Sequence, residues 1–88
     1  MNRDEILATA ATTINGDRDR DYGNASDNFR RMAIGWEVVL GVEVTPAQVA
    51  LCMDWVKTTR LIKSPDHLDS WVDKAGYTAL GAESATGK

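Results

Sequence analysis

Hydrophobic residues recur every three or four positions along four stretches of this chain, a spacing typical of α-helices rather than of strands. The first stretch places its apolar stripe at Leu7, Ala10, Ala11 and Ile14. Asn2 precedes this stripe, and Glu5 lies three residues after Asn2, as in a capping box. Gly16 is a suitable residue to end the helix. The pattern therefore predicts an N-terminal helix over residues 1–15.

A second stripe begins near Ser26 and ends at Gly41. Its apolar positions are Phe29, Met32, Ala33, Trp36, Val39 and Leu40. Residues 16–25, which begin with the sequence GDRDRDYGN, separate the first two stripes and offer no apolar face, so we predict a polar loop there.

Two further helices are predicted from cap and proline signals. Thr45 followed by Pro46 starts a helix that runs to about Lys63, and residues 49–53 are apolar on every side, which favours a central position in the fold. Ser64 and Pro65 repeat the same signal. We expect a fourth helix from about Asp66 to Glu83 and a frayed tail over residues 84–88.

The short connection around Ser64 and Pro65 implies that the third and fourth helices form an antiparallel hairpin. The predicted fold class is all-α: one compact domain, residues 1–88, resembling a four-helix bundle. A chain of 88 residues buries only about 60 to 65% of its unfolded surface, so we also expect a homo-oligomer.

Composition narrows the functional classes. With 43% hydrophobic and 26% charged residues the chain is typical of a soluble globular protein. No apolar run approaches the roughly 20 residues of a membrane span, and the N-terminus does not resemble a signal peptide, so we expect a cytoplasmic protein with no membrane partner. A net charge of −3 argues against binding duplex nucleic acid but leaves a small anionic ligand open.

The single cysteine, Cys52, is expected to be a small buried thiol. One cysteine and one histidine cannot build a structural zinc site, and we expect no cofactor. Aromatic residues on apolar stripes, namely Phe29, Trp36 and Trp71, are expected in the core.

The fourth helix carries the most distinctive chemistry. Its N-terminal part places Asp66, Asp69, Asp73 and Tyr77 on one stripe. In an antiparallel hairpin Lys57 and Arg60 of the third helix lie alongside it. Two interpretations remain open: an inter-helix ion-pair network that only fixes packing, or a site in which these charges meet a ligand.

Further candidates lie near the second helix. Arg20 and Asn28 flank its start, where exposed backbone N–H groups favour an anion, although simple capping is the alternative. Tyr22 lies in the polar loop, away from any predicted core, and is the better candidate for a stacking surface.

Three blocks of sequence resemble a family of small tailed-phage and prophage proteins of unassigned function. The blocks are RDRDYGNASDNF, VTPAQVALCMDWVKTTRL and SPDHLDSWVDKAGYTALGAE. The resemblance covers about Gly16 to Glu83 and implies a phage origin and a compact all-helical fold. The positions that match the family's pattern are Asp21, Tyr22, Gly23, Asn28, Phe29, Lys57, Arg60, Asp69, Asp73 and Tyr77.

A second resemblance is to the all-α nucleoside triphosphate pyrophosphatases of the MazG type, which hold magnesium between two acidic pairs on adjacent helices. Ser70 to Asp73 and the following AGY resemble the second pair. The first pair is missing, because Asp54 is followed by Lys57 and Arg60, which repel magnesium and attract phosphate.

Three functions follow as expectations. The first is a non-catalytic nucleotide binder encoded by a phage, which sequesters a host nucleotide signal of anti-phage defence. Its expected ligand-binding residues are Arg20, Tyr22, Asn28, Lys57, Arg60, Asp69, Asp73 and Tyr77. The second is a divergent magnesium-dependent pyrophosphatase in which Asp54, Asp69 and Asp73 from two subunits hold the metal. The third is a structural or interaction module without a small ligand.

Overall fold

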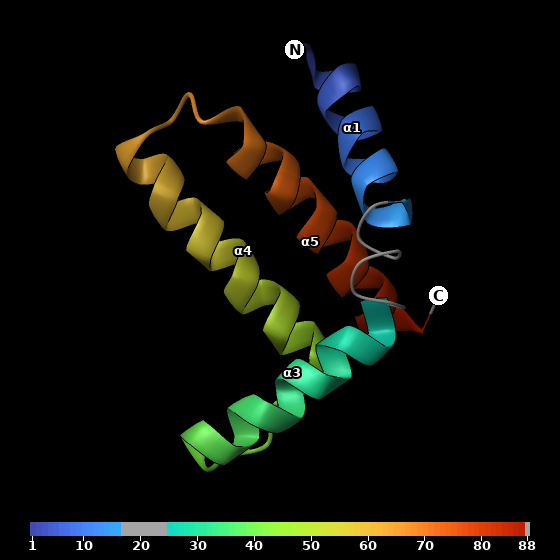
Figure 1. Ribbon diagram of the computed structural model, residues 1–88, viewed down its shortest axis with the longest axis vertical. Helices are drawn as coiled ribbons and strands as arrows, with labels where there is room; N and C mark the ends of the chain where they lie inside the picture. Colours follow the sequence, from blue (N-terminus) through green and yellow to red (C-terminus); the bar gives the residue numbers. More distant parts are fainter. Residues whose placement is uncertain (17–24, 88) are drawn as a thin grey trace.

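The computed structural model describes residues 1–16 and 25–87. Within these residues the chain forms four α-helices, α1 (Arg3–Asn15), α3 (Ala25–Leu40), α4 (Pro46–Lys63) and α5 (Leu68–Thr86). Helices α4 and α5 run side by side as an antiparallel hairpin, α1 packs along α5, and α3 crosses the end of the hairpin where α4 begins (Figure 1). The predicted all-α class and the predicted hairpin are both confirmed.

Local signals account for the ends of most helices. The Asn2 side chain accepts a hydrogen bond from the Glu5 backbone N–H and the capping box closes, as predicted. Thr45 forms the same arrangement with Gln48 at the start of α4. Helix α3 ends at Gly41, whose φ of 72° lies in the left-handed region that glycine adopts without strain.

The bounds predicted for the fourth helix are wrong at both ends. Pro65 and Asp66 form the turn of the hairpin rather than the first helical residues, and α5 begins after His67. At the other end, residues 84–86 of the expected frayed tail continue the helix to Thr86. Gly87 adopts a left-handed conformation there and its N–H bonds the Glu83 carbonyl, which supplies a proper helix end.

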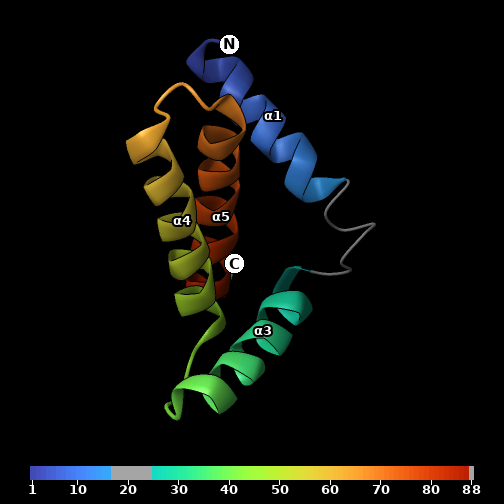
Figure 2. The same ribbon diagram turned by 60° about the vertical axis from the view of Figure 1, so that its left-hand side comes forward.

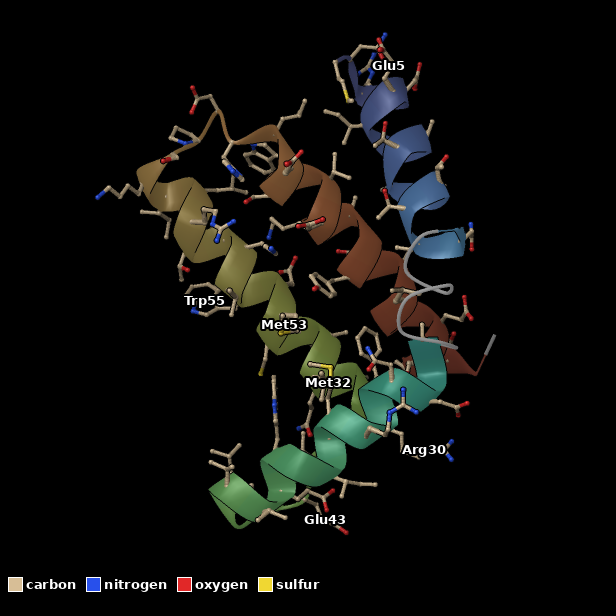
Figure 3. The ribbon with its side chains drawn as sticks, viewed as in Figure 1. Glu5, Arg30, Met32, Glu43, Met53 and Trp55 are labelled. Atoms are coloured by element: carbon tan, nitrogen blue, oxygen red, sulfur yellow. The ribbon has the colours of Figure 1, made fainter. Side chains whose placement is uncertain are left out.

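The core lies where α3, α4 and α5 meet. Its most buried members are Phe29 and Ala33 of α3 and Val49 and Ala50 of α4. Partly buried apolar side chains from all three helices surround them, including Met32, Trp36, Met53, Tyr77 and Leu80. Met32 and Met53 lie where α3 approaches α4 (Figure 3). Phe29 and Trp36 therefore pack as predicted.

Two expectations about burial are wrong. Cys52 is exposed, as is Leu51, because α5 and α3 cover only part of the apolar run 49–53. Trp71 is 45% exposed instead of lying in the core. Its indole N–H donates a hydrogen bond of 2.9 Å to the Pro65 carbonyl, so the ring covers the turn of the hairpin.

A large apolar surface remains uncovered. The C-terminal half of α3 projects beyond the start of α4 in both views of the ribbon (Figures 1 and 2). Trp55 extends from the side of α4 opposite α5 (Figure 3). These two regions carry most of the exposed large apolar residues of the described chain.

Candidate functional site

The antiparallel register of α4 and α5 determines which side chains meet. At the end of the hairpin near the start of α4 the two helices approach very closely, because a Cβ atom placed on Gly81 would lie 2.9 Å from the Cβ of Ala50. Because the two helices are antiparallel, residue numbers rise along α4 as they fall along α5, and the numbers of two facing residues add up to about the same value. Asp54 with Lys74 and Lys57 with Asp73 are examples.

Two ion pairs cross the middle of the hairpin. The Nζ of Lys57 lies 3.0 Å from Oδ2 of Asp73, and the Nζ of Lys74 lies 3.0 Å from Oδ1 of Asp54. Lys74 also donates a hydrogen bond of 2.6 Å to the Thr58 hydroxyl. Each helix contributes one lysine and one aspartate, so the cluster is electrically balanced.

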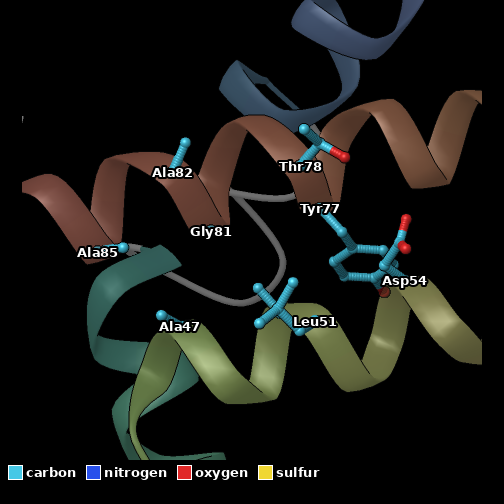
Figure 4. A pocket seen from close by; sticks show the side chains of 9 residues that line it. Ala47, Leu51, Asp54, Tyr77, Thr78, Gly81, Ala82 and Ala85 are labelled. Atoms are coloured by element: carbon cyan, nitrogen blue, oxygen red, sulfur yellow. The ribbon is translucent and has the colours of Figure 1, made fainter.

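A groove of about 300 Å³ lies beside this cluster, between α4 and the C-terminal half of α5 (Figure 4). Its lining is mainly small and apolar and comprises Ala47, Ala50, Leu51, Asp54, Tyr77, Thr78, Gly81, Ala82 and Ala85. Because so many of these side chains end at Cβ, a groove remains beside the close contact between Gly81 and Ala50. Among the described residues that line it, Asp54 is the one charged group, and the Tyr77 ring forms part of the wall next to it.

The sequence-predicted residues fall into three groups. Lys57, Asp73 and Tyr77 lie together at the cluster and the groove, with Lys57 and Asp73 joined directly. Arg60 and Asp69 are exposed and belong to neither ion pair.

Of the three candidates near the second predicted helix, the structure describes Asn28. Asn28 lies in α3, where its side-chain amide is 3.9 Å from the sulfur of Met32. Arg20 and Tyr22 lie outside the described residues. Tyr77 contacts the core as well, since its ring centroid is 6.4 Å from that of Phe29.

The acidic set of the pyrophosphatase alternative is not assembled within one chain. Asp54 and Asp73 each pair with a lysine, and Asp69 is exposed. Over residues 1–16 and 25–87 there is no group of three or more histidine, cysteine, aspartate or glutamate side chains arranged to hold a metal ion. The predicted use of two subunits is not tested by a single chain.

Sequence reasoning missed Lys74, Thr58 and the groove itself. Each follows from the register of the hairpin. Counting outward from the turn places Lys74 opposite Asp54, and it places the small residues Ala47 and Ala50 opposite Ala82 and Gly81. Small residues facing each other across two helices were the available signal for a hollow.

None of the helices in the described part of the chain is long and apolar enough to cross a membrane. No solved structure matches the chain.

Sequence relatives come from bacteriophages. The Gene 55 protein of Mycobacterium phage L5 is 43% identical over 76 residues, which is 85% of this chain and 49% of the relative. The Gene 55 protein of Mycobacterium phage D29 is 34% identical over 74 residues, 84% of this chain and 49% of the relative. The chain thus spans about half the length of these relatives.

A family model described as a domain of unknown function, DUF6378, matches residues 5–85 and so includes all four helices. The first predicted resemblance, to small phage proteins of unassigned function, is confirmed by this match and by the two mycobacteriophage relatives. The chain belongs to the DUF6378 family.

Proposed function

We propose that this chain binds a nucleotide without cleaving it, at the groove between α4 and α5. The observation that supports the proposal is an apolar groove of about 300 Å³ that lies beside a cluster containing two lysines. A base would rest against Tyr77 and the alanines, and its phosphate would compete with Asp54 or Asp73 for Lys74 or Lys57.

The biological setting forms part of the same proposal. Relatives in two mycobacteriophages favour a role in the cytoplasm of an infected bacterium. There, the protein would hold a host nucleotide signal of anti-phage defence and lower its free concentration. Binding alone is sufficient for this role, so no acidic metal site is needed.

The direct test is thermal unfolding of the chain with mono-, di- and cyclic nucleotides, each with magnesium and with a chelator. A ligand at a hundredfold excess over its Kd adds about 2.7 kcal/mol to the free energy of unfolding. We expect stabilisation that does not require magnesium and leaves the nucleotide intact. Magnesium-dependent hydrolysis would instead support the pyrophosphatase, and no shift with any nucleotide would contradict binding.

Filling the groove should abolish binding. Ala82 is exposed in α5 and lines the groove, so Ala82→Leu adds three carbon atoms to the space intended for the base. We expect at least a tenfold loss of nucleotide affinity by calorimetric titration, with little change in the free energy of unfolding, since leucine and alanine are both strong helix formers. Ala8→Leu on the exposed side of α1 is the matched control and should bind normally.

Replacing Asp54 with a neutral residue distinguishes a protein that only binds the nucleotide from a metal-dependent pyrophosphatase. Its carboxylate lines the groove and repels a phosphate, a like-charge interaction worth about 1 kcal/mol at 4 Å in water. Asp54→Asn should therefore strengthen nucleotide binding severalfold, because it also frees Lys74 for the phosphate. Weaker binding of the nucleotide to Asp54→Asn would show that the carboxylate serves the ligand, as a metal-holding enzyme requires.

A further inference from the structure

The side of α4 that faces away from α5 carries an apolar seam. We call this surface the outer face of α4. It consists of Leu51, Cys52, Trp55, Val56, Thr59 and Ile62. Positions 52, 55, 59 and 62 alternate by three and four residues, the spacing by which one helix packs along another. The buried residues of α4, namely Val49, Ala50 and Leu61, lie on the opposite side of the helix.

A second apolar surface continues from the first. Ile34, Val38, Val39 and Leu40 at the end of α3 and Val42 after it are 57–82% exposed. We call these five residues the free end of α3. This segment projects beyond the start of α4 (Figures 1 and 2). A helix lying along the outer face of α4 and extending past Pro46 would meet it.

The exposed area is close to what a dimer needs. Full burial of a Val, Leu or Ile side chain removes on the order of 100 Å² of apolar surface from water, and that of a Trp about 200 Å². Scaled by their exposed fractions, the nine large apolar side chains of the two surfaces offer on the order of 700 Å². Each partner of a standard protein interface contributes roughly 800 Å².

Charge at the two ends of α4 favours a second copy as the occupant. The last turn of α4 carries Arg60 and Lys63, whereas Glu43 is exposed just before its first turn. In an antiparallel pair of α4 helices related by a twofold axis, Lys63 of each copy approaches Glu43 of the other. The same contact then occurs twice, as a symmetric dimer requires.

We propose that two copies of this chain form a dimer by antiparallel packing of the outer face of α4 against its copy, with the free end of α3 completing the interface. Leu51 belongs to this face and also lines the groove, so the partner subunit lies at the open edge of the groove. The dimer does not depend on the proposed nucleotide.

The test measures the mass of the 88-residue chain by sedimentation over a range of concentrations. We expect a species of twice 9.6 kDa that dissociates on dilution. Trp55→Glu and Ile62→Glu should each raise the dimer dissociation constant at least tenfold while the helical circular dichroism is kept, because both side chains are exposed in the single chain. Leu7→Glu, on the exposed side of α1, should leave the dimer intact.

Two further measurements address the geometry of the dimer. Cys52 should react with a thiol reagent more slowly at concentrations that favour the dimer, and at the full rate in the Trp55→Glu variant. Glu43→Lys and Lys63→Glu should each weaken the dimer, and the double variant should restore it. A monomer at all concentrations would overturn the proposal, as would a dimer insensitive to both Trp55→Glu and Ile62→Glu.

Discussion

Replacing Phe29 with alanine should lower the free energy of unfolding by about 3–5 kcal/mol, the usual cost of removing a large side chain from a core. The Phe29 ring is 1% exposed and lies at the centre of the cluster formed by α3, α4 and α5. Domains are stabilised by only about 0.05–0.15 kcal/mol per residue, so the loss would remove a large part of the total. Urea denaturation followed by circular dichroism measures the effect.

Two controls define the result. Leu7→Ala removes a comparable apolar side chain from an exposed position of α1 and should change stability by no more than about 0.5 kcal/mol. Phe29→Leu keeps most of the volume and should cost clearly less than alanine. If the alanine variants at positions 29 and 7 proved equally stable, the assignment of the core would be wrong.

Gly81→Ala should destabilise the hairpin although alanine is the better helix former. The added methyl group would lie 2.9 Å from the Cβ of Ala50, which has no rotatable bond to relieve the clash. Overpacking of this kind costs typically about 1–3 kcal/mol. Thermal and urea unfolding should both show the loss of stability.

Gly35 provides the matched control, because a Cβ there meets no atom within 4 Å. Gly35→Ala should stabilise α3 by roughly 0.5–1 kcal/mol through the better helix propensity of alanine. Adding Ala50→Gly to Gly81→Ala should remove the clash and recover part of the stability, and a double-mutant cycle would quantify the coupling. Purely additive effects would mean that the two helices do not touch at this point.

The helices and the hairpin were predictable because their signals are local. Caps at Asn2 and Thr45, a proline at position 46 and a glycine at position 41 act within one turn of the helix they delimit. The antiparallel hairpin followed from a short connection. These features do not depend on where distant parts of the chain lie.

The incorrect predictions have a different origin, because the burial of a side chain depends on which other helices pack against it. Cys52 was predicted to be buried because it lies in an apolar run, whereas α3 and α5 leave one side of α4 uncovered and both Cys52 and Leu51 are exposed. Trp71 lies on an apolar stripe, yet its N–H group finds an acceptor at the turn. The fourth helix was predicted to begin at about Asp66, whereas Pro65 and Asp66 form the turn and α5 begins at Leu68.

The candidate site was predicted in part. Sequence placed Lys57 beside Asp73, and the structure joins them. It did not separate Arg60 and Asp69 from that pair, because residues three and four positions apart lie on the same side of a helix and the sequence alone does not show which of them contact the neighbouring helix. The groove depends on facing alanines and a glycine, which carry little weight in a search for chemically reactive groups.

The two ion pairs across the hairpin favour one alignment of α4 and α5. Both pairs join residues whose numbers add up to nearly the same value, as Asp54 with Lys74 and Lys57 with Asp73. Sliding α5 along α4 by one helical turn changes this sum by about four residues and lengthens both lysine–aspartate distances. Since partly exposed ion pairs add little to stability, the four charges favour the alignment that keeps small residues opposite one another, with the groove beside them.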